Sequence, residues 1–406
     1  MGIEFISGGV CAPKGFKAAG IHCGIRKNRL KPDLGMIVSD VPCTAAGVYT
    51  QNKVKGAPIF VTKEHLKDNT ARAVLVNSGN ANTCNADGVE VANAMCESAA
   101  QALGIAAQDM IIASTGVIGQ PLPLGPIISS MEKLVGSLSY EGSSKAAEAM
   151  LTTDLIKKEG AVEITLGGVP VRIGAIAKGS GMLQPNMATM LCFICSDAAI
   201  GADMLKKALK AAVDDTLNMV SVDGDTSTND TCAILCNGLA GNREITAEDE
   251  DYTVFAAALK SLLIKLTREL ARDGEGATKL IEVNLSGAPD TATAKKIAKS
   301  VINSMLFKSA IFGCDANWGR ILCAIGYTDA AFDIDKTDVY LESLAGKIQV
   351  CENGHGVAFS EEFAREILLR DEITVDIQLN QGDGKATAWG CDLTYDYVKI
   401  NGEYRT

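Results

Sequence analysis

The stretch KGSGMLQPNMATMLCFICS, residues 178–196, carries the strongest structural signal in the chain. It begins with a glycine-rich segment and continues into an apolar run, 190–195, that has the composition of a buried strand. The sequence therefore predicts a loop that delivers a small hydroxyl residue, Thr189, to the start of a core strand. If the chain were cut before Thr189, the hydroxyl would lie next to its own free α-amine, which is a nucleophile paired with a base. A glycine loop that simply leads into a strand is the alternative interpretation of the same residues.

The composition is that of a compact protein with a large core. The chain has 406 residues, of which 47% are apolar and 21% charged, so we expect two domains or one large interlocked domain. Its formal net charge of −11 argues against a nucleic acid or an anionic membrane surface as partner. Because no apolar run approaches about 18 residues, no membrane span is expected. The N-terminus also lacks the basic and apolar regions of a signal peptide.

The cysteines predict reduced thiols. There are 13 of them, an odd number scattered over the whole length, which is not the pattern of a disulfide framework. Cys192 and Cys195 have CxxC spacing but belong to the apolar run, and the chain has only three histidines. We therefore expect no metal site and a cytoplasmic protein.

Hydrophobic periodicity and turn residues predict alternating strands and helices. Two glycines, at 167 and 168, separate the alternating runs 162–166 and 169–176, which is a hairpin signal. Helices are expected at 88–103 with Asp87 as N-cap, in two pieces over 122–150, and at 202–217, 252–271 and 293–306. Further strands are expected at 73–76, 110–113, 339–341, 348–351, 374–379 and 386–397. Hairpins without regular βαβ alternation favour an α/β (α+β) layered sandwich.

Several strand-end turns are rich in Gly, Asn, Ser and Thr and could offer backbone N–H groups to an oxyanion or a carboxylate. They are residues 77–82, 114–116, 178–189, 223–230, 273–279 and 313–319. Each alone is weak evidence, because turns favour these residues for conformational reasons. The chain has no GxxxxGK[ST], GxGxxG or GxSxG motif, so neither a nucleotide site nor an α/β-hydrolase is expected. An N-terminal threonine needs no histidine, since an α-amine with a pKa of roughly 7.7–8 is itself a usable base.

At these turns the sequence resembles the ornithine acetyltransferase (glutamate N-acetyltransferase) family of arginine biosynthesis, from the N-terminal segment to the last residue. The most specific matches are residues 114–119, 178–182, 186–191, 273–279 and 313–320. Several long motifs in the right order are stronger evidence than any one of them. The resemblance implies an autoprocessed α/β sandwich with an N-terminal threonine nucleophile, distinct from the standard N-terminal-nucleophile hydrolases.

The resemblance also implies a reaction and an assembly. The chain would cut itself between Ala188 and Thr189, giving an α chain of residues 1–188 and a β chain of 189–406 that share one core. Thr189 would then take the acetyl group from N2-acetylornithine and pass it to glutamate by a ping-pong mechanism. The cleaved αβ units would pair into a heterotetramer. No cofactor is expected, and whether acetyl-CoA serves as a second acetyl donor is not encoded in these motifs.

The family's site residues map onto positions of this chain. The resemblance implies that Thr115 and Gly116 form the oxyanion hole. It implies substrate contacts at Thr152, Lys178, Thr189, Glu275, Asn401 and Thr406. Thr153 fits the motif nearly as well as its neighbour Thr152. The residue types suit these roles: a lysine can meet a substrate carboxylate, and a glutamate can meet the side-chain amine of ornithine.

Two other functions use the same residues differently. An aminopeptidase or amidohydrolase would employ Thr189 in the same way, but water rather than an amine would resolve the acyl-enzyme. A non-catalytic binding protein would keep its chain intact. Cleavage of the chain distinguishes the two enzymes from a binding protein. The effect of glutamate on acetate release distinguishes the transferase from the hydrolase.

Overall fold

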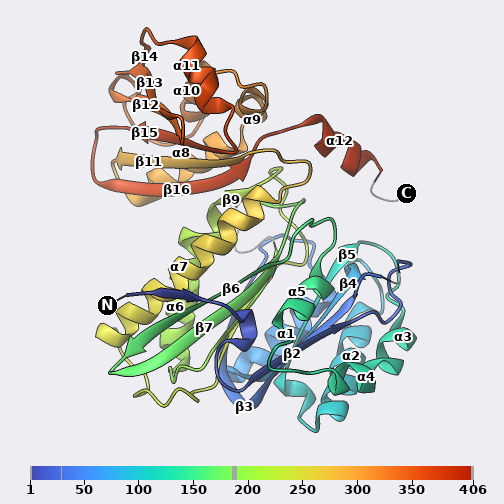
Figure 1. Cartoon of the computed structure of the whole chain (residues 1–406). Helices are drawn as coiled ribbons and strands as arrows, with labels where there is room; N and C mark the ends of the chain where they lie inside the picture. Colours follow the sequence, from blue (N-terminus) through green and yellow to red (C-terminus); the bar gives the residue numbers. More distant parts are fainter. Residues whose placement is uncertain (1, 29, 185–189, 404–406) are drawn as a thin grey trace. The chain divides into compact units, whose positions relative to one another are not determined.

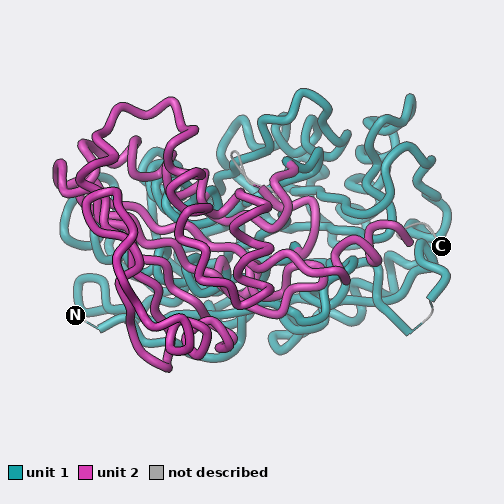
Figure 2. The backbone as a smooth tube through the Cα atoms, turned by 90° about the horizontal axis from the view of Figure 1, so that it is seen from above, with its two compact units in different colours: residues 1–179, 185–218, 226–266 teal, residues 180–184, 219–225, 267–406 magenta. Residues whose placement is uncertain are grey.

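A computed structural model describes residues 2–28, 30–184 and 190–403. The chain divides into two compact units, which Figure 2 draws in different colours. Unit 1 comprises Met1–Gly179, Pro185–Asn218 and Thr226–Leu266, and unit 2 comprises Ser180–Gln184, Met219–Asp225 and Thr267–Thr406. Each unit has its own sheet.

Unit 1 is built on a nine-stranded sheet with the order β1-β6-β7-β8-β10-β3-β4-β5, to which β2 adds by pairing with β3 (Figure 1). Its strands are β1 (Glu4–Ile6), β2 (Phe16–Ile21), β3 (Leu34–Tyr49), β4 (Thr70–Asn80), β5 (Met110–Val117), β6 (Lys158–Leu166), β7 (Val169–Lys178), β8 (Leu191–Ser196) and β10 (Thr231–Cys236). The long strand β3 joins two parts of this sheet. Its first half pairs with β2 and β4, and its second half pairs with β10.

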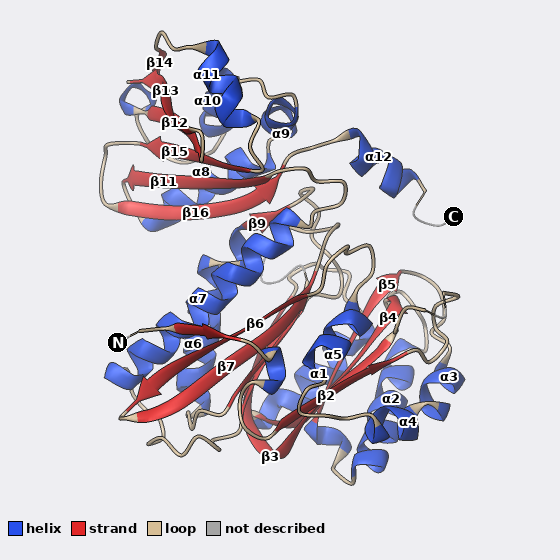
Figure 3. Ribbon diagram, viewed as in Figure 1, coloured by secondary structure: helices blue, strands red, loops and turns tan. Residues whose placement is uncertain are grey.

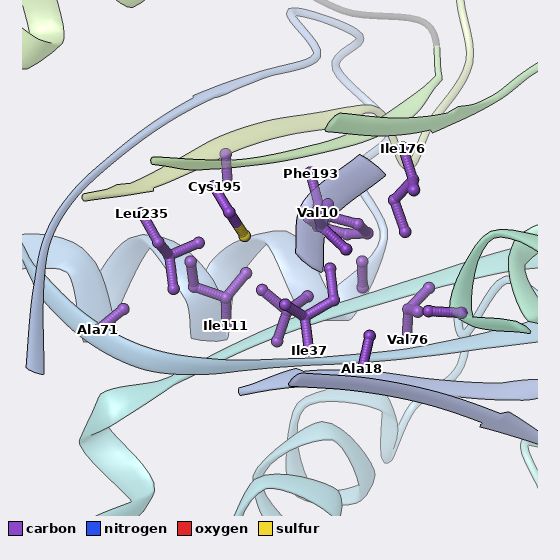
Figure 4. Packing of buried hydrophobic residues seen from close by; sticks show 14 of the residues in the cluster. Val10, Ala18, Ile37, Ala71, Val76, Ile111, Ile176, Phe193, Cys195 and Leu235 are labelled. Carbon is purple, nitrogen blue, oxygen red and sulfur yellow. The ribbon is translucent and has the colours of Figure 1, made fainter. Parts of the chain in front are cut away.

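The main core of unit 1 lies between these two parts of the sheet. Figure 4 shows Phe193 and Cys195 of β8 directed toward Ile37 of β3 and Ile111 of β5. All four side chains are at most 1% exposed. The unit is therefore a sandwich whose layers are joined by one continuous strand.

Helices cover both outer faces of this sandwich (Figure 3). They are α1 (Ala57–His65), α2 (Gly88–Leu103), α3 (Leu124–Ser129), α4 (Met131–Gly136), α6 (Ala202–Asp215) and the first part of α7 (Glu250–Arg272). Helix α5 (Ser143–Met150) instead contributes Ala146, Ala147 and Met150 to the main core between the layers. A second apolar cluster joins α2, α3 and α4 to β4 and β5. On β6, a Cβ at Gly160 would lie 3.0 Å from Cδ1 of Leu262, so α7 packs closely there. The predicted α/β layered sandwich is confirmed.

The apolar run of the quoted stretch forms strand β8. All six of its residues are buried, and it lies between β7, which is antiparallel to it, and β10, which is parallel. A strand covered on both faces reads as a continuous apolar run, as this one does. Cys195 faces the core cluster, whereas Cys192 pairs in register with Cys232, so the CxxC spacing makes no shared site. All 13 cysteines are free thiols.

Unit 2 contains a seven-stranded sheet with the order β14-β13-β12-β15-β11-β16-β9. The strands are β9 (Val220–Ser221), β11 (Leu280–Ala288), β12 (Asp338–Ser343), β13 (Gly346–Glu352), β14 (His355–Gly356), β15 (Glu372–Gln378) and β16 (Gly384–Cys391). The helices of this unit after α7 are α8 (Thr291–Asn303), α9 (Met305–Phe312), α10 (Trp318–Gly326), α11 (Glu361–Leu368) and α12 (Tyr395–Gly402). Helix α8 packs on β16, where a Cβ at Gly390 would lie 2.6 Å from Cγ1 of Ile302.

Several predicted elements are confirmed. The hairpin of β6 and β7 turns at Gly167 and Gly168, whose φ angles of 53° and 86° suit a tight two-residue turn. Helix α2 has the predicted bounds, although Asp87 makes no side-chain capping hydrogen bond. None of the helices in the described residues is long and apolar enough to cross a membrane.

The prediction of one strand over 386–397 is wrong in its second half. Strand β16 ends at Cys391, and α12 begins at Tyr395. The carboxylate of Asp392 accepts hydrogen bonds from the backbone N–H groups of Thr278 and Lys279, which ends the strand pairing at that point. The β-branched and aromatic residues that follow have the composition of a strand but do not form one. The two helical pieces predicted over 122–150 are three, α3, α4 and α5.

Replacing Phe193 with alanine tests whether β8 depends on the core. The ring is 0% exposed, so Phe193→Ala should cost about 3–5 kcal/mol of stability and lower the melting temperature measured by circular dichroism. The matched control is Phe60→Ala, because Phe60 is 53% exposed and its loss should cost less than about 1 kcal/mol. Equal melting temperatures for the two variants would contradict the burial of β8.

Candidate active site

The predicted site residues are distributed over both units. Unit 1 contains Thr115, Gly116, Thr152 and Lys178. Unit 2 contains Glu275 and Asn401. The predicted junction Ala188–Thr189 and the predicted contact Thr406 lie outside the described residues.

Thr115 and Gly116 belong to the last part of β5, which continues through the turn predicted at 114–116 and pairs irregularly with β4. Buried asparagines fix this irregular end of the strand pair, which we continue to call the oxyanion turn. Ser114 Oγ donates a hydrogen bond of 2.6 Å to Asn77 Oδ1, and Asn77 Nδ2 donates one of 2.9 Å to the carbonyl of Asn80. Asn77 is 0% exposed. These bonds hold the ends of the parallel strands β4 and β5 together, so the turn is a rigid element.

Gly116 cannot be another residue without moving the neighbouring backbone. Its φ is +130°, and a Cβ would lie 2.4 Å from the carbonyl carbon of Gly79 and 2.6 Å from the nitrogen of Asn80. Real Cβ contacts are never that short, and side chains other than glycine rarely adopt this φ. The close approach places backbone against backbone at the predicted oxyanion turn.

Asn229, a residue without a predicted role, connects this turn to the start of β10. Its Nδ2 donates hydrogen bonds to the carbonyls of Ser114 (2.9 Å) and Ala81 (2.5 Å). Its Oδ1 accepts from the hydroxyls of Thr83 (2.6 Å) and Thr228 (2.5 Å). The sequence signal was present, because Asn229 belongs to the polar turn 223–230, but nothing in that turn distinguished it from its neighbours.

Thr152 and Lys178, both predicted to contact substrate, are brought together in unit 1. Lys178 Nζ donates a hydrogen bond of 2.8 Å to Thr152 Oγ1. Thr153, the other candidate at this position, has no such bond to Lys178 among the described contacts. The geometry therefore favours Thr152 as the partner of the lysine.

Asp154 organises this pair and was not predicted. Its Oδ1 accepts hydrogen bonds from Lys158 Nζ at 2.8 Å and from the N–H of Gly179 at 2.7 Å. Its Oδ2 accepts from the N–H of Thr152 at 3.1 Å and lies 3.7 Å from Lys178 Nζ. No motif of the sequence marks this aspartate. Thr152 and Lys158 are its neighbours along the chain, but Lys178 and Gly179 are brought to it by the pairing of β6 and β7.

The charge state of Asp154 follows from these contacts. Burial would raise its pKa, but the positive charges of Lys178 and Lys158 and the hydrogen bonds from Lys158 and from the backbone of Thr152 outweigh that effect. The pKa is held well below the usual range of a carboxyl. Asp154 is therefore an anion in the folded protein.

Asp230 has the opposite environment. It is 2% exposed, and its Oδ2 has no hydrogen-bond partner. Burial raises its pKa well above the usual range, although Ser227, Lys178 and Thr50 lower it in part. Asp230 therefore favours its neutral form, directly before β10.

Glu275 and Asn401 form the part of the predicted site in unit 2. Asn401 Nδ2 donates a hydrogen bond of 2.7 Å to Glu275 Oε2. Glu275 is 7% exposed, and its backbone N–H donates to the carbonyl of Ser180. A Cβ at Gly181 would lie 2.3 Å from the carboxyl carbon of Glu275, so the glycine makes room for this carboxylate.

Asp223 holds the backbone of the segment 180–184. Its carboxylate accepts the backbone N–H groups of Met182 (2.6 Å) and Leu183 (2.9 Å), and the hydroxyl of Tyr397 at 3.3 Å. Burial, followed by the charge of Asp223, raises the pKa of Tyr397. Residues 180–184 are thus fixed by side chains of unit 2 and lead directly to the segment that contains Ala188 and Thr189.

The three histidines are bonded to backbone carbonyls or to Asp33. Among the described residues, no three His, Cys, Asp or Glu side chains converge on a possible metal position. His65 is bonded to the carbonyl of Met110, and His22 to Asp33 and the carbonyl of Lys31. His355 is exposed on the strand β14. The described site therefore offers hydroxyls, an ammonium, carboxylates and amides.

The comparisons with known proteins extend over the whole chain. Residues 17–406 match the ArgJ family. The arginine biosynthesis bifunctional protein ArgJ of Symbiobacterium thermophilum is 50% identical over 406 residues, covering 100% of both chains. The protein of the same name from Bacillus subtilis is 46% identical over 403 residues, which are 99% of this chain and 97% of the relative.

A solved structure agrees with these relatives. The crystal structure of the arginine biosynthesis bifunctional protein ArgJ from Bacillus halodurans has a TM-score of 0.51 and 44% sequence identity. It covers 53% of this chain and 99% of the other. The resemblance to the ornithine acetyltransferase family is confirmed, and the chain belongs to the ArgJ family.

Proposed function

We propose that this protein moves the acetyl group of N2-acetylornithine to glutamate through an acetyl ester on Thr189, giving ornithine and N-acetylglutamate. Its membership of the ArgJ family supports the reaction. One structural observation carries the mechanism. The N–H of Thr231 donates to the carbonyl of Met190, and Asn229, two residues earlier, donates to the carbonyl of Ser114. One short segment therefore links the residue after Thr189 to the predicted oxyanion turn.

Maturation begins with the uncleaved chain. We propose that the Thr189 hydroxyl attacks the carbonyl carbon of Ala188, so that the peptide becomes an ester and the nitrogen of Thr189 becomes a free amine. Water then hydrolyses the ester, which restores the hydroxyl and leaves Ala188 with a carboxylate. The products are an α chain, 1–188, and a β chain, 189–406, that share one core.

Acetyl transfer uses the same groups twice. The Thr189 hydroxyl gives its proton to the neighbouring α-amine as it attacks the acetyl carbonyl of N2-acetylornithine. The amine returns that proton to the departing nitrogen of ornithine, and the acetyl group remains on Thr189 as an ester. The α-amine of glutamate then attacks this ester and the bond between the acetyl carbon and the threonine oxygen breaks. The proton of the amine passes to that oxygen, which restores the hydroxyl, and N-acetylglutamate leaves.

The oxyanion that forms at each attack needs hydrogen-bond donors. We assign this role to Thr115 and Gly116, a hydroxyl and a backbone N–H at the end of β5. A preorganised donor of this kind contributes about 3–4 kcal/mol to the transition state. The asparagine bonds of the turn and the close approach of Gly116 to Gly79 make it rigid enough for that purpose.

The charged residues select the substrates. We propose that Lys178, with Thr152, binds a carboxylate of the amino-acid substrate, and that Glu275, with Asn401, binds the side-chain amine of ornithine. Thr406 contributes a further substrate contact. No cofactor is required, because the threonine supplies both nucleophile and base. We further propose a cytoplasmic heterotetramer of two α and two β chains.

An intact Thr189 is required for cleavage in this proposal. On a denaturing gel the wild-type protein should give two bands, residues 1–188 and 189–406, whereas Thr189→Ala should give a single band of full length. Thr189→Ser keeps a hydroxyl and is the control, which should still be cut. Cleavage of Thr189→Ala would refute the role of this threonine.

The acceptor distinguishes a transferase from an amidohydrolase. With N2-acetylornithine and glutamate, the cleaved enzyme should form N-acetylglutamate and ornithine in equal amounts, measured by mass spectrometry. Without glutamate, ornithine release should stop after about one equivalent per site, because the acetyl ester on Thr189 persists until an amine attacks it. Acetate release at a rate that glutamate does not change would favour the amidohydrolase. The same assay with acetyl-CoA in place of N2-acetylornithine measures whether acetyl-CoA can also transfer its acetyl group to Thr189.

Glu275→Gln should impair the use of N2-acetylornithine selectively. The change removes the negative charge that faces the cationic side chain, so kcat/KM for N2-acetylornithine should fall about 10- to 100-fold, as expected for a lost hydrogen bond between charged groups. Attack of glutamate on the preformed acetyl ester should fall less. Glu372→Gln, on a half-exposed carboxylate of unit 2, is the control and should match the wild type. An equal loss in both half-reactions would contradict this assignment.

A further inference from the structure

The most completely bonded carboxylate at the site has no part in the predicted mechanism. The side chains of both Asp154 and Lys158 are 0% exposed, and their charges are joined by a 2.8 Å ion pair. Both carboxylate oxygens of Asp154 are used, and their partners include Thr152, Lys178 and Gly179. A single carboxylate thus fixes three chain positions at one end of β6 and β7.

The two lysines do not share Asp154 equally. Lys158 Nζ is within hydrogen-bond distance of Oδ1, whereas Lys178 Nζ lies 3.7 Å from Oδ2 and directs a 2.8 Å hydrogen bond to Thr152 Oγ1. The Lys178 side chain is 10% exposed, so it is the member of the group that borders the surface. The Asp154 carboxylate therefore acts on Lys178 as a nearby charge, while Lys178 keeps its hydrogen bond to the Thr152 hydroxyl.

The charge count explains why two lysines are present. A buried carboxylate with no cation is unfavourable, and Lys158 supplies that cation permanently. A second ammonium at 3.7 Å is still attracted, because charge interactions are stronger away from water. The group of Asp154, Lys158 and Lys178 carries a net charge of one positive unit, and that unit resides on the side where Lys178 lies.

We propose that Asp154 is a positioning residue of the acetyl-transfer site, which holds Lys178 in its charged form beside the Thr152 hydroxyl. Lys158 is the counterion that keeps Asp154 anionic. The lowered pKa of Asp154 agrees with this arrangement. The inference rests on the proposed function, in which Lys178 binds a carboxylate of the substrate. A purely structural ion pair is the competing explanation.

Removing both members of the buried pair separates these explanations. In Asp154→Asn/Lys158→Met neither buried charge is left unpaired, so the fold should persist, whereas Lys178 loses the carboxylate. Lys178 should then lose its proton at lower pH. The alkaline limb of the profile of kcat/KM for N2-acetylornithine should move down by about one pH unit. At a fixed pH on that limb, where the rate follows the protonated fraction of Lys178, kcat/KM should fall about tenfold.

Lys158→Met alone should produce the opposite shift. It removes a competing cation and leaves the whole carboxylate to Lys178, so the alkaline limb should move to higher pH. Asp215→Asn/Lys260→Met makes the same two substitutions in a half-exposed ion pair of unit 1, 2.7 Å long, and should leave the profile unchanged. Circular dichroism of each variant establishes that it is folded.

Opposite shifts in the two variants support the positioning role, and a folded double variant with the wild-type profile overturns it. If the double variant does not fold, the direction of the Lys158→Met shift decides. An uncleaved double variant supports the inference only if Lys178→Met is also uncleaved, and otherwise overturns it. Wild-type enzyme that transfers no acetyl group would refute the proposed function instead.

Discussion

The side-chain amide of Asn229 is the interaction on which the arrangement of unit 1 depends. An amide can donate two hydrogen bonds and accept two, and all four are made here, to carbonyls on one side and hydroxyls on the other. Because Ala81 and Thr83 follow β4 and Ser114 belongs to β5, one residue aligns the oxyanion turn with the start of β10. An aspartate of the same shape would place an oxygen against the carbonyls of Ala81 and Ser114, so the position requires an amide.

Two buried carboxylates near this point respond to pH in opposite directions. The pKa of Asp154 is lowered by its lysines, so it stabilises the fold above its unfolded pKa, and that stability is lost as pH falls through the folded value. The pKa of Asp230 is raised by burial, so its contribution is present at low pH and is lost as pH rises. Groups whose surroundings separate their pKa values in this way are typical of acid–base sites. Here Asp154 accepts a hydrogen bond from the buried ammonium of Lys158 and also feels the charge of Lys178, whereas Lys178 lowers the pKa of Asp230 only in part.

The sequence predicted those features that local pattern determines. The strand β8, the helix α2 and the hairpin of β6 and β7 follow from apolar periodicity and paired glycines. Substrate contacts at Thr152, Lys178, Glu275 and Asn401 were implied only by family resemblance, and the hydrogen bonds that pair these residues were not predicted. The roles of Asp154 and Asn229 were not predicted, because their distant partners depend on which strands become neighbours. The error at 395–397 has a similar cause, since a long-range bond from Asp392 ended the strand.

The position of the predicted cut is compatible with a single core on energetic grounds. Strand β7 ends at Lys178, β8 begins at Leu191, and these two residues are partners in register. The 12 residues between them close a short loop, and opening such a loop changes the chain entropy by about 2 kcal/mol. Burial of a phenylalanine such as Phe193 alone contributes about 3–5 kcal/mol. Strand pairing and packing on both faces of β8 therefore outweigh the loss of the covalent link, and the nucleophile can become a chain end without loosening the strand that carries it.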